Sequence, residues 1–128
     1  MLDIEIKGTG IDIIEVSRVN RLIDKYGDDF ISKVFTENEW RYCSSKSNPS
    51  IHLSLRIAAK EAVAKALGWQ KHSIPWKDIE YNVDDEVPKV ILNGRLKALA
   101  VERGIHKIIV SGTHSKEYAV CNAIAVSK

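Results

Sequence analysis

Residues 51–68 read IHLSLRIAAKEAVAKALG, the longest run of helical spacing in the chain. One face of this run carries mostly small apolar residues, namely Ile51, Leu55, Ala58, Ala59, Ala62 and Ala66. Gly68 follows the last periodic position, where a glycine commonly ends a helix. The pattern predicts a helix over Ile51–Leu67 that packs its small-residue face closely against a sheet or another helix.

Charged residues border that face. Glu61 and Lys65 are four positions apart, which places their Cβ atoms ~5–6 Å apart on one side of the helix. The simplest interpretation is an exposed ion pair worth roughly a few tenths of a kcal/mol. Arg56 and Lys60 are expected to emerge on the far side. A helix with a carboxylate and cations on both borders could instead hold a metal ion and several phosphates.

The segments before this helix contain one strand and further helices. Ile4–Val16 is rich in isoleucine around Gly8-Thr9-Gly10 and is expected to be a strand that enters a loop. Ser17 can cap a helix whose apolar positions run from Val19 to Phe30. Thr36-Glu37-Asn38-Glu39 has the spacing of a capping box, which predicts another helix start. Ser44–Ser50 is a loop by its composition.

The second half of the chain favours strands. The expected elements are a hairpin of Asp78–Val83 and Val87–Leu92, a helix over Gly94–Arg103 capped by Asn93, and a final hairpin of Ile108–His114 and Tyr118–Val126. The order is roughly β-α-α-α-β-β-α-β-β. Hairpins and helices in separate runs predict an α+β fold with a mostly antiparallel sheet packed against the long helix. A length of 128 residues suits a single domain over 1–128.

Composition excludes several classes of protein. An apolar fraction of 45% is too high for a disordered chain, and a formal charge of +2 is too small for a general nucleic-acid coat. The two cysteines, Cys43 and Cys121, cannot make a disulfide framework, so reduced thiols are expected. We find no signal peptide and no apolar stretch of the ~20 residues that a membrane helix needs. A soluble, cytoplasmic protein without a membrane or nucleic-acid partner is expected.

Two isolated polar residues are candidates for chemistry. Asp12 lies in the apolar run Ile11–Ile14, where a carboxylate must be solvated on one face, paired, or bound to a cation. The simplest interpretation is a strand residue that faces solvent. His114 ends a strand beside Ser111 and Thr113, a position polar enough to meet an anion. A lone histidine is more often a structural hydrogen-bonding group.

The first helix has a cationic flank. Arg18, Arg21 and Lys25 span about 60° of the helical wheel and stand beside Leu22. Such charges usually form a solvated face. Because the flank is purely cationic with an apolar residue between the charges, it could also dock an acidic partner helix.

Together these segments resemble the holo-acyl-carrier-protein synthases, the short class of 4′-phosphopantetheinyl transferases. The resemblance rests on Gly8-Thr9-Gly10-Ile11-Asp12-Ile13, Phe35-Thr36-Glu37-Asn38-Glu39, the run from Ala58 to Gly68, Ser111-Gly112-Thr113-His114-Ser115 and Tyr118-Ala119. Its most specific element is K-E-A-x-x-K, which follows G-x-D in the family's order. Two positions depart from the family pattern: Ile57 where an aromatic or large residue usually precedes A-A-K-E, and Gly112 where an apolar residue usually separates two hydroxyls.

The resemblance implies transfer of the phosphopantetheine arm of coenzyme A to a serine of apo acyl carrier protein, in support of fatty acid biosynthesis. Asp12 and Glu61 match the family's Mg²⁺ ligands, and Mg²⁺ prefers hard oxygen ligands with phosphates and waters. Glu61, or a metal-bound water that it orients, is the implied base, and Lys65 would neutralise charge developing on the pyrophosphate. The implied contacts of the coenzyme A phosphates are Arg56, Lys60, Lys65 and His114.

The resemblance also implies a partner for the cationic helix and a homotrimeric state for the chain. Carrier proteins are acidic around the acceptor serine, so Arg18, Arg21, Leu22 and Lys25 would dock that surface. Members of the short class are trimers with active sites between subunits, and the apolar strand Ala119–Ala125 suits a subunit contact. The rival class is a binding module whose basic helix meets RNA, but the tryptophans are not interleaved with cations as a stacking platform requires.

Overall fold

The structure, a computed structural model, describes residues 3–84 and 86–128. Along the chain its elements are β1 (Ile6–Glu15), α1 (Val16–Tyr26), α2 (Asp28–Val34), α3 (Glu37–Ser44), α4 (Pro49–Leu67), the 3₁₀ helix η1 (Trp76–Asp78), β2 (Ile79–Asp84), β3 (Val87–Leu92), α5 (Gly94–Glu102), β4 (Lys107–His114) and β5 (Tyr118–Val126). The predicted α+β fold and element order are confirmed, with η1 added before β2.

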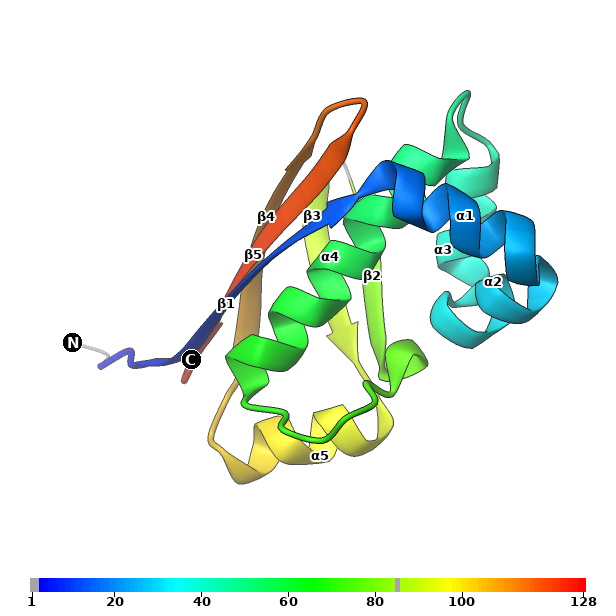
Figure 1. Cartoon of the computed structure of the whole chain (residues 1–128). Coiled ribbons are helices and arrows are strands. Elements are labelled where there is room, and N and C mark those ends of the chain that lie inside the picture. Colours follow the sequence, from blue (N-terminus) through cyan, green and yellow to red (C-terminus); the bar gives the residue numbers. More distant parts are fainter. Residues whose placement is uncertain (1–2, 85) are drawn as a thin grey trace.

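The strands form two antiparallel sheets rather than one. The larger sheet has the order β1-β5-β4, and β2 and β3 form a separate hairpin. Figure 1 shows α4 running along the larger sheet, with α1, α2 and α3 gathered beyond it. In that sheet Asp12 pairs with Cys121, and His114 pairs with Ala119. Because directly paired residues point to the same face, Asp12 and His114 lie on the face that α4 covers.

The backbones of β1 and α4 approach each other very closely. A Cβ atom on Gly8 would collide with the carbonyl oxygen of Ala66, and one on Gly10 would collide with that of Ala62. The two glycines therefore let the strand backbone rest directly on the helix. The predicted strand is confirmed, and both glycines lie inside it and serve this close approach. The predicted loop after the strand is absent, because α1 begins directly at Val16.

The final strand packs inside its own chain. Ala119, Ala123 and Ala125 of β5 are all fully buried and belong to the core beneath α4. The expectation that this alanine-rich surface forms a subunit contact is therefore wrong for the alanine face. Within the described residues, no helix combines the length and apolar character needed to cross a bilayer.

Several helix ends differ from the predictions. One long helix was expected from Ser17 to Phe30, but Gly27, at φ 54°, separates α1 from α2. Ser17 lies inside α1, and the residue before that helix, Glu15, makes no side-chain cap. The capping box of α3 is confirmed. The Thr36 hydroxyl accepts from the Glu39 amide at 3.2 Å, and the Glu39 carboxylate accepts from the Thr36 amide at 2.9 Å.

The start of α5 is capped from a distance. Asn93 precedes the helix as predicted, but its side chain makes no capping hydrogen bond. The Asp78 carboxylate accepts instead from the amides of Arg95, at 2.8 Å, and Leu96, at 3.3 Å. Asp78 of η1, seventeen positions before Arg95, thus satisfies two backbone amides at the start of α5 that have no partner within the helix.

We expect Gly10→Ala to destabilise the protein by about 1–3 kcal/mol, because the added methyl group forces β1 away from α4. Thermal or urea unfolding measures this loss. The control is Gly104→Ala, since Gly104 has φ 69° and a Cβ atom there would meet nothing closer than 3.8 Å. That control carries only backbone strain of about 1 kcal/mol. Equal losses in the two variants would contradict the close-packing role of Gly10.

Candidate active site

A pair of carboxylates faces one another between β1 and α4. Asp12 follows Gly8 and Gly10 on the inner face of β1, so the close packing of those glycines brings its side chain against the helix. Glu61 lies on the same flank of α4, and the two carboxyl groups share a hydrogen bond. The side chain of Asp12 is only 14% exposed. The interpretation of Asp12 as a solvent-facing strand residue is therefore wrong.

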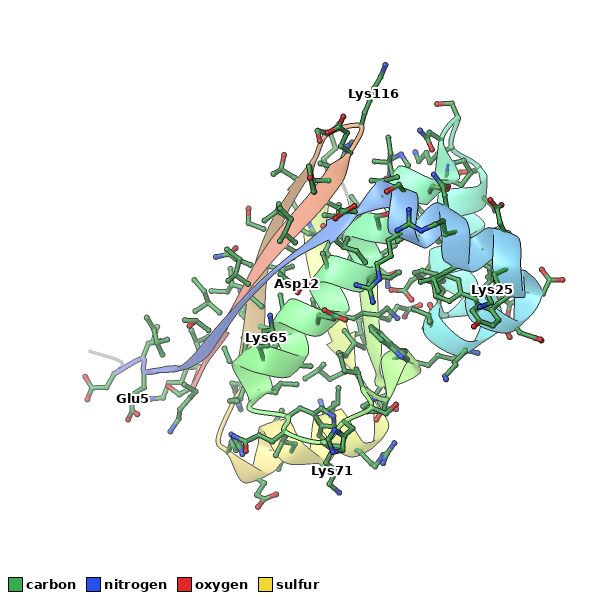
Figure 2. The ribbon with its side chains drawn as sticks, viewed as in Figure 1. Glu5, Asp12, Lys25, Lys65, Lys71 and Lys116 are labelled. Atoms are coloured by element: carbon green, nitrogen blue, oxygen red, sulfur yellow. The ribbon has the colours of Figure 1, made fainter. Side chains whose placement is uncertain are left out.

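Lys65 joins the carboxylate pair of Asp12 and Glu61 to the strand. Its ammonium donates to the backbone carbonyl of Ile11 at 2.9 Å and lies 3.4 Å from the Asp12 carboxylate. Figure 2 shows Asp12 and Lys65 facing each other across β1 and α4. The expected exposed Glu61–Lys65 ion pair gives way to this contact between elements. With its side chain 56% exposed, Lys65 remains accessible to a ligand.

Burial and mutual repulsion disfavour a negative charge on both carboxyl groups at once. The pKa of Glu61 is raised from 4.5 to about 7, first by burial and then by the charge of Asp12 and the hydrogen bond with its carboxyl. Lys65 and Arg18 act against this rise. Without a cation between the carboxyl groups, Glu61 therefore keeps its proton until the pH rises to about 7.

The carboxylate pair opens into a cavity of about 180 Å³ that reaches α1. Its lining combines the carboxylates with Arg18 and Leu22 of α1 and with the apolar residues Ile13, Ile14, Phe30, Val34, Ile57 and Trp76. The predicted partner-docking helix and the predicted metal ligands thus share one cavity. Trp76 and Phe30 were not predicted, because they come from η1 and α2 and no spacing in the sequence connects them to Asp12.

The donor set at this site fits a hard divalent cation. Two carboxylates converge from different elements, and the described residues contain no group of three His, Cys, Asp or Glu side chains that could hold a metal. Mg²⁺ is commonly held by one or two carboxylates, with substrate phosphates and waters completing its shell. A cation between Asp12 and Glu61 would also replace the shared proton. The pair therefore suits a metal that binds together with a phosphate substrate.

Lys60, the neighbour of Glu61, lies in the interior. Its ammonium donates to the carbonyls of Val34 at 2.9 Å and Ile79 at 2.8 Å, and it pairs with the Glu39 carboxylate at 2.7 Å. Both side chains of the pair are fully buried. A further carbonyl, that of Trp76, lies at 3.0 Å. The expectation that Lys60 emerges to meet a phosphate is therefore contradicted, because every donor of the ammonium is already used inside the protein.

Arg56 is buried as well, with 1% of its surface exposed. Its guanidinium lies between the rings of Tyr42, at 4.5 Å, and Tyr81, at 5.0 Å, as a cation–π pair on each side. One guanidinium nitrogen donates to the carbonyl of His52 at 3.2 Å. The expected emergence of Arg56 toward a phosphate is likewise contradicted. The residue joins α4 to α3 and β2 instead.

His114 remains exposed and lies at a different place from the carboxylate pair. Its ring packs edge-on against that of His52, with centroids 5.6 Å apart. The pKa of His52 is lowered by burial and by Arg56, His114 and Lys46, so these groups form one cationic cluster. His52 and Glu61 are nine positions apart on α4, which places them on opposite flanks of the helix. The structure therefore does not bring His114 together with Asp12 and Glu61 within one chain.

The spacing of His52 and Arg56 could have indicated this cluster, because residues four apart share a helix face.

The fold also accommodates the two positions that depart from the family pattern. Ile57 is buried and lines the cavity of the carboxylate pair. A Cβ atom on Gly112 would stand 2.7 Å from a methyl group of Leu55, so Leu55 takes the space of the missing side chain.

The cationic flank of α1 is exposed at Arg18, Arg21 and Lys25, with Leu22 half-buried among them. A second cavity, of about 240 Å³, continues from Leu22 over Tyr26 and Phe30. Because Leu22 and Phe30 also line the first cavity, one apolar groove runs from the carboxylate pair along the cationic flank. Figure 2 shows Lys25 on α1, well separated from Asp12 on β1.

Comparison with known proteins gives a consistent match. A family model described as the 4′-phosphopantetheinyl transferase superfamily matches residues 8–123. A Chlamydia trachomatis serovar L2 protein described as holo-[acyl-carrier-protein] synthase is 47% identical over 119 residues, which are 92% of this chain and 98% of that protein. The holo-ACP-synthase structure from Plasmodium yoelii has a TM-score of 0.86 at 32% identity and covers 99% of both chains. A holo-(acyl-carrier-protein) synthase from Bacillus anthracis in complex with CoA (3′,5′-ADP) has a TM-score of 0.76 at 33% identity, covering 96% of this chain and 98% of that one.

The raised pKa of Glu61 makes stability depend on pH. The folded value of about 7 exceeds the ordinary value of 4.5, so the folded protein keeps a proton that the unfolded chain releases. This contribution to the free energy of unfolding is complete below about pH 4.5 and is lost as the pH rises through about 7. We expect a loss of about 1–2 kcal/mol over this window without divalent cations, after allowance for solvent screening. Urea unfolding with a chelator measures it, and Glu61→Gln should lack this part of the slope. Equal slopes in both proteins would contradict the assignment.

Proposed function

This chain belongs to the 4′-phosphopantetheinyl transferase superfamily and is a phosphopantetheinyl transferase, and we propose that it converts an apo acyl carrier protein to the holo form with coenzyme A as donor. In this reaction a serine oxygen of the carrier protein forms a bond to the phosphorus of the phosphopantetheine arm. The pyrophosphate bond of coenzyme A breaks and adenosine 3′,5′-bisphosphate leaves. The observation that carries the proposal is the carboxylate pair beside Lys65, in a cavity that Arg18 and Leu22 complete.

The carboxylate pair and Lys65 divide the chemistry. Asp12 and Glu61 would hold Mg²⁺, which when bound polarises the attacked phosphorus and steadies the leaving phosphate. Glu61, in the ionised form that a bound cation favours, would accept the proton of the serine hydroxyl directly or through a water that it orients. Lys65 is anchored to Ile11 and directs its remaining donors to the pyrophosphate.

The remaining coenzyme A contact comes from another part of the fold. Arg56 and Lys60 are left out of the phosphate contacts because both are buried and engaged. His114 stays in the proposal, now within the cluster of His52 and Lys46. Since α4 separates this cluster from the carboxylate pair, the two halves of a site can meet when His114 comes from a neighbouring subunit.

The outer face of the larger sheet supports such a neighbour. Ile11 and Ile13 of β1 are 64% and 62% exposed, and Ile109 of β4 is 47% exposed. These side chains point away from α4 and form an apolar surface of the kind that assemblies cover. We place the subunit contact of a homotrimer on this face.

The reaction fits one domain over residues 1–128 in the cytoplasm, with fatty acid biosynthesis as its context. Both cysteines are free and buried, as expected in a reducing compartment. A role in RNA binding is disfavoured, because the cationic flank of α1 ends at two carboxylates, which repel a phosphate backbone unless a metal intervenes. The apolar groove beside that flank suits a protein helix better.

Mass spectrometry tests the function directly. The protein is incubated with coenzyme A, Mg²⁺ and an apo acyl carrier protein, and the carrier should gain the mass of one phosphopantetheine group. The adduct should be absent when the acceptor serine is replaced by alanine. A carrier protein whose mass does not change under these conditions would overturn the proposal.

Asp12→Ala and Glu61→Gln should each lower the transfer rate by roughly a hundredfold or more, because each removes one ligand of a shared metal. The double variant should lose far less than the product of the single losses, since the carboxylates act as a unit. Initial rates over a Mg²⁺ titration measure this, and calorimetry checks metal binding apart from turnover. Losses that simply multiply, or near wild-type rates at saturating Mg²⁺, would refute the shared-metal assignment.

Arg21→Glu should raise KM for the carrier protein about tenfold and leave KM for coenzyme A unchanged, because the side chain lies on the docking flank and away from the carboxylates. The effect should shrink with added salt, since the Debye length is ~10 Å at 0.1 M. Lys71→Glu is the matched control, because Lys71 follows α4 at the opposite end of the molecule (Figure 2). Equal effects of both reversals would argue against a docking face on α1.

Light scattering should give the mass of three chains. Ile11→Glu together with Ile109→Glu should dissociate the assembly and reduce activity with it, because two charges enter the apolar outer face. Val87→Glu, at an exposed residue on β3, is the control and should change neither. A monomer that is fully active at nanomolar concentration would exclude both the trimer and the shared site.

A further inference from the structure

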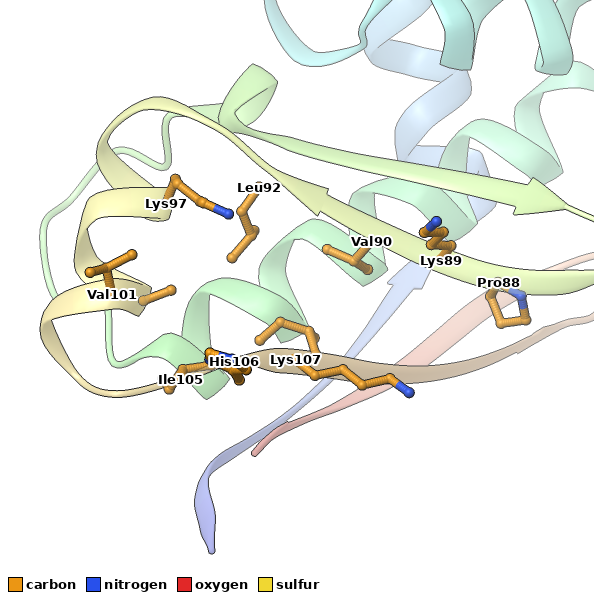
Figure 3. A pocket seen from close by; sticks show the side chains of 11 residues that line it. Pro88, Lys89, Val90, Leu92, Lys97, Val101, Ile105, His106 and Lys107 are labelled. Atoms are coloured by element: carbon orange, nitrogen blue, oxygen red, sulfur yellow. The ribbon is translucent and has the colours of Figure 1, made fainter. Parts of the chain in front are cut away.

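A separate cavity lies where the two sheets part. It has a volume of about 230 Å³ and lies between β3, the C-terminal half of α5 and the start of β4 (Figure 3). β3 and β4 belong to different sheets, so their facing edges leave the core uncovered at this place. None of its lining residues is shared with the cavity of the carboxylate pair, so the two sites are independent.

The floor of this cavity is apolar. Ala100 and Ile105 are buried members of the core, while Val90, Leu92 and Ile108 are only partly buried against it. Val90, Leu92 and Ile108 therefore keep part of their apolar surface exposed to water. An apolar group that covered them would gain burial free energy.

The rim of the cavity is cationic. Lys89, Lys97 and Lys107 stand around it from three different elements, and His106 joins them. Figure 3 shows the Lys97 side chain reaching from α5 toward Leu92 of β3. No Asp or Glu belongs to the lining, and within residues 3–83 and 86–128 none of the three lysines forms an ion pair. An anionic group at the mouth would therefore meet uncompensated positive charge.

We propose that this cavity binds an anionic amphiphile, a carboxylate with an apolar tail of medium length. The tail lies on Val90, Leu92 and Ile105, and the carboxylate meets the ammonium of Lys97, while Lys107 lies across the cavity on β4. The cavity volume of about 230 Å³ admits a short apolar tail, and octanoate is a probe of this class. The ligand bridges β3 and β4, which no sheet hydrogen bonds connect in the described chain.

Exposed strand edges are often protected by lysine and proline, and Pro88 and Lys89 of β3 could serve that purpose alone. Edge protection requires neither an apolar floor nor Lys97, which lies on a helix. Edge protection also predicts that no ligand binds, so a binding measurement separates the two roles.

Titration calorimetry of the full chain with sodium octanoate tests the proposal, with NMR amide shifts to locate the ligand. We expect a dissociation constant on the order of 0.1–1 mM, as for a small ligand of this size. The shifts should concentrate on Val90, Leu92 and Ile108. Butyrate, which has the charge without the tail, and 1-octanol, which has the tail without the charge, should each bind about tenfold more weakly or worse.

Lys97→Glu should weaken octanoate binding about tenfold or more, because the reversed charge faces the carboxylate. Lys107→Glu is a second variant and should act in the same direction. Lys71→Glu, the same change away from the cavity, should leave binding within about twofold. Binding that is absent, that is equal in the Lys97→Glu and Lys71→Glu variants, that follows charge or tail alone, or that shifts residues near Asp12 instead would overturn the proposal.

Discussion

The direct contact between the backbone of β1 and the carbonyl groups of α4 is the constraint on which the site depends. Gly8 and Gly10 have no side chain to hold the helix away, and Ala62 and Ala66 present carbonyls without bulk around them. The next residue on the same face of the strand is Asp12. Its carboxylate can meet Glu61 and Lys65 only because the strand lies this close. Packing of small residues thus sets the distance between the groups that are proposed to do the chemistry.

The opposite side of α4 is fixed by a charge in the interior. Lys60 and Glu39 form a fully buried ion pair, and three backbone carbonyls surround the same ammonium. Glu39 also accepts from the amides of Thr36 and Tyr81, both at 2.9 Å. A buried ion pair does not by itself add stability, but its hydrogen bonds allow only one arrangement of the elements that supply them. Because Lys60 precedes Glu61, this arrangement also orients the carboxylate on the next position of the helix.

The two flanks of α4 therefore carry different functional groups. One flank holds the carboxylate pair and opens toward the cationic side of α1, where an acidic partner would bring its acceptor group. The other flank carries His52 and His114. A single helix separates these groups, and the apolar outer face of the sheet stays exposed. Both features agree with the proposed assembly, in which a neighbouring subunit would complete the site.

The sequence by itself determined the features that depend on neighbouring residues. The periodicity and Gly68 predicted α4 to within two residues, and the spacing of Thr36 and Glu39 predicted the start of α3, because these signals involve contacts within one or two helical turns. The resemblance in sequence selected Asp12, Glu61 and Lys65, although no spacing between them indicates that they meet.

Only the tertiary structure decided which distant residues each side chain contacts. Lys60 and Arg56 have the sequence context of exposed cations, yet their partners come from α2, α3 and β2, and burial with those partners reversed the prediction. The cap of α5 likewise comes from Asp78 rather than Asn93. Gly8 and Gly10 lie in the expected strand, but the close approach that they permit is set only when α4 packs on that strand. Such contacts join residues far apart in the chain, so their energies are set only when the elements pack.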